Sequence, residues 1–355
     1  MLADVLIDGG AGEGGGQVLR TALALSLLTG RGFRLFNVRA NRPKPGLAAQ
    51  HLASVEAAAA VGQASVRGNK LGSREVIFPP GPVQGGHYDF RIGTAGATAL
   101  VLHTISLPLL LRASQPSTIR ILGGTHVKAA PCFEYLHHTW AGYLAQLGGR
   151  VMVKLECRGF FPIGQGGISA TIEPCPGLRG FQPTQSSEAP DPPLVRCFSF
   201  ATGNPKVCRE PAELAREQAL AFTAVLEKQG FSVQSEVKED KSQRVGTYVG
   251  GLLPTSPVPT FHFCVGERGK RAQVVGETAA AQLLHHWQAS PCAVDAHAAD
   301  QLLLPLVFAE GPSRFATAEV TSHLLTNAAT ISRFVDRPIH MVGNRGEPGT
   351  VEIAG

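Results

Sequence analysis

The sequence has few cysteines, few charged residues and no long apolar run, and these shortages exclude several classes of protein. Its seven cysteines are scattered without a CxxC pair, so we expect neither a disulfide scaffold nor a paired-cysteine zinc site. The longest apolar run, residues 97–111, contains a histidine and a proline and is shorter than the ~20 residues of a membrane span. No basic and then apolar leader opens the chain. We therefore expect a cytoplasmic protein with reduced thiols, no signal peptide and no membrane partner.

Hydrophobic residues make up 44% of the 355 residues and charged residues 17%, which excludes a disordered chain and indicates a globular protein of about two domains. The net charge of +5 is compatible with a polyanionic ligand without requiring one. The basic charge is uneven, because residues 1–45 carry six basic side chains against three acidic ones.

Strand and helix patterns alternate along the chain and indicate an α/β (α+β) fold made of similar units. Helical patterns occur at residues 18–29, 47–62, 97–111 and 135–148, with strand-like alternation between them. Residues 182–194 are polar and rich in proline, as linkers are. The patterns that follow predict a smaller α/β domain at 181–289, inserted into a large domain formed by 1–180 and 290–355.

A glycine-dense loop, GGAGEGGG at residues 9–16, precedes the first helical pattern. Glycine allows backbone N–H groups to approach a ligand closely, and a helix N-terminus favours anions. The loop lacks the GxxxxGK[ST] pattern of a P-loop and an acidic residue about 20 positions on, so a structural turn and a phosphate-binding loop both stay open. Glu13 would repel a phosphate unless a cation lay between them, and it therefore indicates a divalent metal.

Basic side chains follow this loop. Arg20 lies on the helix after it, and Arg39 and Arg42 flank a strand end and a proline turn. Guanidinium groups bind phosphate oxygens in bidentate fashion. Each arginine taken alone is more often a solvated surface charge. Three of them beside a glycine-rich loop favour an anion site.

A histidine at the start of a helical pattern is the first candidate for catalysis. In SHLLTNAATISRF, residues 322–334, Thr321 or Ser322 can cap a helix whose first turn holds His323. The helix dipole disfavours a protonated ring there, so a neutral imidazole could attack an activated phosphorus. The alternative is a histidine that makes only a structural hydrogen bond.

Two further histidine-containing stretches are less specific. His297 and Asp300 lie three residues apart, on one side of a helix, and Gln301 follows them. This group could hold a metal or a nucleotide sugar, or simply cap the helix. His285 and His286 follow a leucine pair and are interpreted as a solvated helix end.

Six segments, taken together and in order, resemble the RNA 3′-terminal phosphate cyclase family. They are DGGAGEGGGQVLRTALALSLLTG (8–30), RPKPGLAAQHL (42–52), GGTHVKAAP (123–131), GFFPIGQGG (159–167), DAHAADQLLLP (295–305) and SHLLTNAATISRF (322–334). The resemblance extends over residues 4–180 and from 290 to the end, and it is weak between 181 and 289. The ordered set is much more specific than any one segment.

This resemblance implies a reaction and a fold. Enzymes of the family use ATP and a divalent metal, Mg²⁺ or Mn²⁺, to convert an RNA 3′-phosphate to a 2′,3′-cyclic phosphate. Their histidine attacks ATP to give a covalent histidyl-AMP and pyrophosphate, AMP passes to the RNA 3′-phosphate, and the 2′-hydroxyl then expels AMP. The implied fold is a large domain of repeated βαβαββ-type units with a smaller inserted α/β domain.

The resemblance also implies roles for individual residues. His323 corresponds to the nucleophile and Glu13 to the metal-associated glutamate, and Arg20 and Arg42 join them as catalytic residues. The residues implied in phosphate contacts are Arg20, Arg39, Arg42, Gln50 and His51. The residues implied in nucleotide binding are His103, Pro131, His297, Asp300, Gln301 and His323.

Two departures and two alternatives accompany the resemblance. The bacterial pattern has tyrosine in place of His297 and glutamine in place of His103, so the contacts to adenine or ribose are expected to differ. A non-catalytic cyclase-like scaffold in ribosome assembly would lack the nucleophile. A transferase of related fold acting on a small phosphorylated substrate would form no adenylated enzyme. The oligomeric state stays open, with a homodimer as one option.

Overall fold

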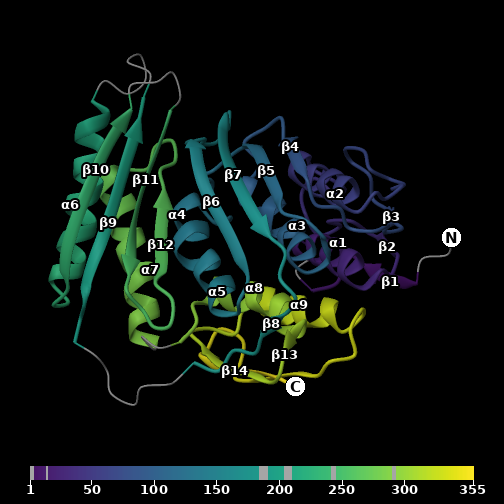
Figure 1. The fold of residues 1–355 in the computed structure, drawn as a ribbon. Coiled ribbons are helices and arrows are strands. Elements are labelled where there is room, and N and C mark those ends of the chain that lie inside the picture. Colours follow the sequence, from purple (N-terminus) through teal and green to yellow (C-terminus); the bar gives the residue numbers. More distant parts are fainter. Residues whose placement is uncertain (1–3, 13–14, 184–190, 204–209, 241–244, 290–292) are drawn as a thin grey trace.

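The computed structural model describes residues 4–12, 15–183, 191–203, 210–240, 245–289 and 293–355. Within these residues, Figure 1 shows a large part built on several small sheets and a smaller part built on a sheet of its own. Helices and strands are mixed throughout both parts, which confirms the predicted α+β class.

The first unit is an open sheet with two helices. Its elements are β1 (Val5–Asp8), α1 (Gln17–Thr29), β2 (Phe33–Phe36), α2 (Ala49–Val61) and β3 (Val76–Phe78). The strand order is β1-β2-β3, with β1 parallel to β2 and β2 antiparallel to β3. Helix α1 ends at Gly30, whose left-handed backbone (φ 72°) stops the helix where the helical pattern at 18–29 ends.

The second unit repeats this arrangement with one more strand. Its elements are β4 (His87–Arg91), α3 (Thr98–Arg112), β5 (Ser117–Gly123), α4 (Phe133–Tyr135), the π-helical turn η1 (Leu136–Trp140), α5 (Ala141–Gln146), β6 (Arg150–Cys157) and β7 (Gly166–Glu173). The strand order is β4-β5-β7-β6. Helix α3 is the buried apolar helix predicted at 97–111, and it continues through Pro108.

The third unit contains the elements from α8 to β16. Its elements are α8 (Ala296–Val307), β13 (Ala309–Glu310), β14 (Ser313–Thr317), α9 (Ser322–Ile331), β15 (Ile339–Val342) and β16 (Gly349–Ile353). The order β14-β16-β15 matches β5-β7-β6 of the second unit, and both sets are antiparallel. Strand β13 pairs in parallel with β8 (Leu178–Arg179), which joins this unit to the end of the second.

The smaller part lies within the predicted insert at 181–289. Its elements are β9 (Leu194–Thr202), α6 (Pro211–Glu227), β10 (Ser232–Asp240), β11 (Gly246–Leu253), β12 (Thr260–Val265) and α7 (Ala272–Ala289). The strand order is β10-β9-β11-β12. One face of this sheet forms a separate core with α6 and α7, while aromatic and aliphatic residues of the other face join the core of the large part.

A buried ionic network fastens the smaller part to the large part. Glu134, which is 5% exposed, accepts hydrogen bonds from Tyr248 of β11 (2.6 Å) and Arg158 (3.4 Å) and pairs with His126 (2.7 Å). Burial alone would raise the pKa of Glu134, but these partners outweigh burial and lower that pKa to about 2. The carboxylate therefore stays ionised and holds β11 against the loop that follows β5.

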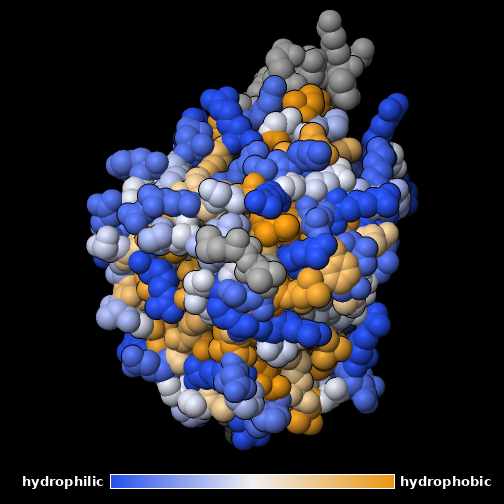
Figure 2. All heavy atoms as spheres, turned by 90° about the vertical axis from the view of Figure 1, so that its right-hand side faces the viewer, coloured by the Kyte–Doolittle hydropathy of each residue, from blue (hydrophilic) through white to orange (hydrophobic). Residues whose placement is uncertain are grey.

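The surface on the side of the first unit carries both polar and apolar side chains. Figure 2 shows hydrophilic and hydrophobic side chains mixed over that side. Among the described residues, none of the helices is long and apolar enough to cross a bilayer.

Candidate active site

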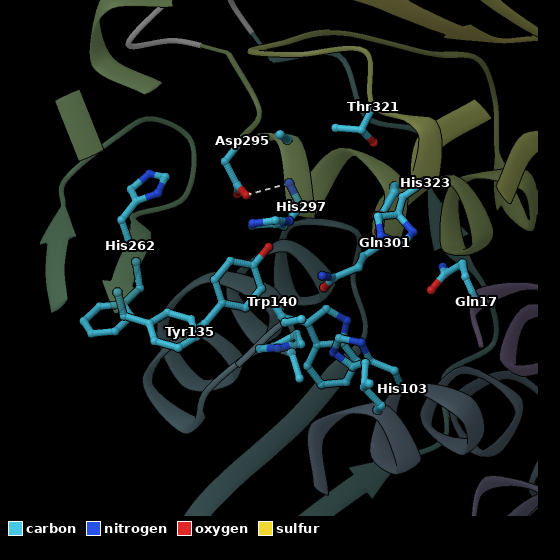
Figure 3. A pocket seen from close by; sticks show the side chains of 18 of the residues that line it. Gln17, His103, Tyr135, Trp140, His262, Asp295, His297, Gln301, Thr321 and His323 are labelled. Carbon is cyan, nitrogen blue, oxygen red and sulfur yellow. Dashed lines mark hydrogen bonds between the residues drawn. The ribbon is translucent and has the colours of Figure 1, made fainter. Parts of the chain in front are cut away.

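The smaller part, the third unit and the helices α1 and α3 enclose a cavity of about 1060 Å³ (Figure 3). Sequence-predicted residues from five separate segments line it. These are Arg20, His103, Pro131, His297, Asp300, Gln301 and His323. The fold therefore brings every predicted nucleotide-binding residue to one place.

His323 lies in the first turn of α9, as the sequence predicts. The hydroxyl of Thr321 accepts the backbone N–H of Leu324 at 3.0 Å and so caps the helix. Figure 3 shows His323 at one end of the cavity, close to Gln17 and Gln301. A nucleophile at this helix start would meet an incoming phosphate in a field that favours anions.

A buried asparagine fixes α9 relative to the other helices. Asn327 lies one turn after His323, and its Oδ1 accepts a hydrogen bond from the Thr21 hydroxyl of α1 at 2.6 Å. Its Nδ2 donates to the backbone oxygen of Asp300 of α8, also at 2.6 Å. Since Thr21 follows Arg20, these two bonds set the position of His323 relative to Arg20.

Two buried polar atoms of the cavity, His103 Nε2 and Gln301 Oε1, find no hydrogen-bond partner among the described residues. The Tyr135 hydroxyl, in the same cavity, interacts with the carboxylate of Asp295. Buried polar atoms are normally paired because leaving one unpaired costs about 1–3 kcal/mol. Donors and acceptors left in a cavity of this size fit a polar ligand such as a nucleoside.

The imidazole of His103, which lines the cavity, is neutral. Burial, and then the positive charge of Arg20, lower its pKa from the ordinary 6.5 to about 3. Its ring lies 4.7 Å from that of Trp140, centroid to centroid. His103 can therefore exchange a directed hydrogen bond with a ligand at neutral pH but adds no charge to the cavity.

A group of cationic side chains, called here the arginine cluster, lies beside the cavity. It consists of Arg20, Arg39 and Arg42 around His51, against the backbone of Gly15 and Gly16. A Cβ atom on Gly16 would collide with His51 Nε2 and lie 2.8 Å from Arg20 Nη1, and one on Gly15 would lie 3.1 Å from Arg42 Nη2. Glycine is needed here because the backbone and these side chains approach so closely.

The charges of the cluster act on one another. Burial, followed by the charges of Arg20, Arg39 and Arg42, lowers the pKa of His51 from 6.5 to about 3. Burial also lowers the pKa of Arg20 to about 10, against the opposing effect of Asp300. A phosphate would relieve this repulsion, because it supplies the negative charge that the cluster lacks.

Known proteins resemble this chain over nearly its whole length. A family model described as RNA 3′-terminal phosphate cyclase matches residues 11–341. The chain is 38% identical over 340 residues to the RNA 3′-terminal phosphate cyclase of Archaeoglobus fulgidus, covering 96% of this chain and 98% of that protein. The chain belongs to this family.

The chain is also 37% identical over 354 residues to the cyclase of Methanopyrus kandleri, covering 98% and 97% of the two chains. For the cyclase of Ralstonia nicotianae the identity is 39% over 336 residues, covering 94% and 92%.

Two of the residues predicted to contact phosphate, Arg39 and Gln50, also have structural contacts. Arg39 has a left-handed backbone (φ 54°), and its Nη1 donates to the backbone oxygens of Lys44 and Gly46, so part of this guanidinium closes its own loop. Gln50 Oε1 accepts the backbone N–H of Ala97 at 2.8 Å. This bond holds the start of α2 against the loop that precedes α3.

Glu13, the predicted metal-associated residue, lies outside the described residues. Among the residues that the structure does describe, no group of three histidine, cysteine or acidic side chains could hold a metal ion. Magnesium commonly binds through one or two carboxylates together with substrate phosphates, so the predicted metal does not require such a group. The metal therefore stays a prediction that rests on Glu13 and the substrates.

Sequence reasoning missed the contribution of the insert to the cavity. His286 is 2% exposed, so its interpretation as part of a solvated helix end was wrong. Its Nε2–H donates to the oxygen of Ala293 (3.0 Å), which leaves Nδ1 to accept from His262 of β12 (2.9 Å). Residues of β12 and α7 form one wall of the cavity, together with the aromatic rings of Tyr135 and Trp140 from the large part.

Proposed function

We propose that this protein converts an RNA 3′-terminal phosphate to a 2′,3′-cyclic phosphate with ATP, through a covalent adenylate on His323. The observation that carries the proposal is the junction of two sites at Arg20. One is a cavity with unpaired polar atoms and a histidine at a helix start, and the other is the arginine cluster. The relatives named above, which are called RNA 3′-terminal phosphate cyclases, support the same substrate.

In the first step, a ring nitrogen of His323 attacks the α-phosphorus of ATP. A nitrogen–phosphorus bond forms, the bond from that phosphorus to the bridging oxygen of the β-phosphate breaks, and pyrophosphate leaves with the electron pair. Arg20 and the N-terminus of α9 stabilise the charge that develops on the phosphoryl oxygens. His103, Gln301 and Asp300 orient the nucleoside in the cavity.

In the second step, an oxygen of the RNA 3′-phosphate attacks the same phosphorus and His323 leaves. The arginine cluster holds the RNA phosphate for this attack. The adjacent 2′-hydroxyl oxygen then attacks the 3′-phosphorus, AMP leaves and the hydroxyl proton is released. A divalent metal, when bound near Glu13, would neutralise phosphate charge during these transfers.

The first test is labelling with ATP that carries radioactive α-phosphate. The wild-type protein should retain label after denaturation, and a histidine phosphoramidate keeps the label in alkali and loses it in acid. The variant His323→Ala should retain none, while His340→Ala, which removes an exposed histidine of β15, should label like the wild type. Equal labelling of His323→Ala would show that the nucleophile is another residue.

The second test is conversion of a 3′-phosphorylated RNA to a product resistant to phosphatase. Labelled enzyme that transfers nothing to RNA would refute the proposed acceptor while leaving the nucleophile intact. The cytoplasmic location expected from the cysteine pattern stays a prediction, which imaging of the tagged protein would test.

A further inference from the structure

The hairpin loop between β6 and β7 ends in an apolar tip that the proposed reaction does not use. Phe161 is 78% exposed and Ile163 is 59% exposed, and Pro162 between them is exposed as well. Single exposed apolar side chains are common on protein surfaces. Three in succession at the tip of one loop form a small apolar surface, called here the 161–163 tip.

The tip stands on a rigid base. The backbone N–H of Gly159 donates to the Thr125 hydroxyl at 2.9 Å, and the backbone N–H of Gly164 donates to the oxygen of Phe160 at 2.7 Å. The ring of Phe160 is buried and lies 5.5 Å from that of His126. The tip is therefore presented in a fixed shape, although its own side chains gain little from burial.

A short series of contacts connects the tip with the arginine cluster. A Cβ atom on Gly164 would lie 2.8 Å from the backbone oxygen of Thr94, and one on Gly96 would lie 3.0 Å from the Cβ of Gln50. Gln50 precedes His51 of the cluster. Exposed Arg91 ends β4 immediately before this connecting loop and adds positive charge to the same edge.

We propose that the 161–163 tip stacks against a base of the RNA strand whose 3′-phosphate occupies the arginine cluster. Proteins that bind single strands combine cationic groups for the backbone with exposed aromatic rings for the bases. The tip and the cluster supply these two parts, separated by one loop. RNA is favoured over a protein partner because the apolar surface is small and Arg91 and the arginine cluster flank the loop that the tip contacts.

This inference rests on the proposed function, and its test compares two substrates. One is a 3′-phosphorylated dinucleotide, and the other is a 3′-phosphorylated single strand of about ten nucleotides, within the span of single-strand grooves. Phe161→Ala should raise KM for the longer strand about tenfold, as loss of one stacked base predicts, with kcat and the dinucleotide KM nearly unchanged. Labelling of His323 by ATP alone should also be unchanged.

Conservative variants separate stacking from general hydrophobic contact. Phe161→Trp should keep the low KM for the longer strand, whereas Phe161→Leu should raise it as Phe161→Ala does. Leu220→Ala removes a 70% exposed apolar side chain from α6 and serves as the matched control.

The outcomes distinguish this inference from the proposed function. If the wild type cyclises both substrates with equal KM, or if Phe161→Ala changes neither, the stacking site is refuted while cyclisation stands. A change in oligomeric state of Phe161→Ala on gel filtration, with an unaltered KM, would assign the tip to a protein contact instead. Absence of adenylylation in the wild type would refute the proposed function itself.

Discussion

The arginine cluster and the cavity meet at Arg20, yet the chain assembles them in different ways. The cluster comes from residues 15–51, a short stretch, and collects several positive charges. The cavity draws its walls from segments as distant as Gln17 and Asn327 and includes the insert. Its walls carry buried polar atoms, such as His103 Nε2 and Gln301 Oε1, that have no partner among the described residues. The cluster therefore recognises charge, whereas the cavity recognises the shape and hydrogen bonds of a ligand.

This difference has consequences for how each region responds to change. Binding through exposed charges weakens as salt screens them, and it tolerates small displacements. Directed hydrogen bonds in a buried cavity are less sensitive to salt but demand accurate positions. Arg20 belongs to both regions, so changes near it are expected to disturb both.

The largest effect is expected from a substitution beside Arg20, the residue that the two regions share. In Gly16→Ala, the new methyl group would collide with His51 and crowd Arg20, so both side chains must move. We expect both adenylylation and cyclisation to fall by at least about 100-fold, because such displacements from productive geometry are costly. Single-turnover assays of the two steps would measure this.

A matched control for that variant is Gly32→Ala in the same unit, since a Cβ atom there would make only ordinary contacts, the nearest 3.4 Å away. Neither Gly16 nor Gly32 has a left-handed backbone, so the two variants differ in crowding and not in strain. If Gly16→Ala labels and cyclises no worse than Gly32→Ala, the close approach at Gly16 has no functional importance.

A smaller effect is expected from a substitution in the cluster alone, which should affect RNA turnover more than adenylylation. Arg42→Ala should lower kcat/KM for 3′-phosphorylated RNA by about 10- to 100-fold, since it removes a charge-assisted contact. Adenylylation should change by less than about threefold, because Arg42 does not line the cavity. The salt dependence of RNA turnover should also become shallower.

Arg34→Ala is the control for the loss of one charge in the same unit, since Arg34 pairs at the surface with Glu75. Equal loss of adenylylation and RNA turnover in Arg42→Ala would contradict the division of labour between cluster and cavity. Such a result would assign Arg42 to the ATP site.

The smallest effect concerns the pH dependence of folding stability that His103 causes. His103 is protonated near pH 6.5 in the unfolded chain but only near pH 3 when folded, so between these values the unfolded state binds more protons. Stability should therefore fall as the pH drops from about 6.5 toward 3, by about 1 kcal/mol per pH unit from this residue. His103→Gln should reduce that slope, as measured by urea unfolding across this pH range. An unchanged slope, with His340→Gln as the surface control, would show that His103 does not titrate as the geometry implies.

The fold was predictable where local pattern and burial agree. The apolar run at 97–111 became α3 because every turn of that helix lies against other elements. Thr321 caps α9 as expected, since capping depends on neighbours a few residues away. The π-helical turn at 136–140 was not predicted, because nothing in its sequence distinguishes it from an α-helix.

The candidate site was predictable where the residues carry charge or stand beside glycine. His286 was misjudged because its burial depends on β12 and on the backbone of Ala293 rather than on its own segment. Tyr135 and Trp140 gave no signal, since aromatic residues on a helix are usually core residues.

The sequence alone thus determined the position of His323 at a helix start, the glycine loop and the succession of arginines. These features depend on capping, backbone freedom and charge, which act over a few residues. Only the tertiary structure decided that His51 and His103 stay neutral, which polar atoms lack partners, and that the insert closes the cavity. Burial and electrostatic neighbourhood depend on segments hundreds of residues apart, such as Thr21 and Asn327, and no local pattern encodes them.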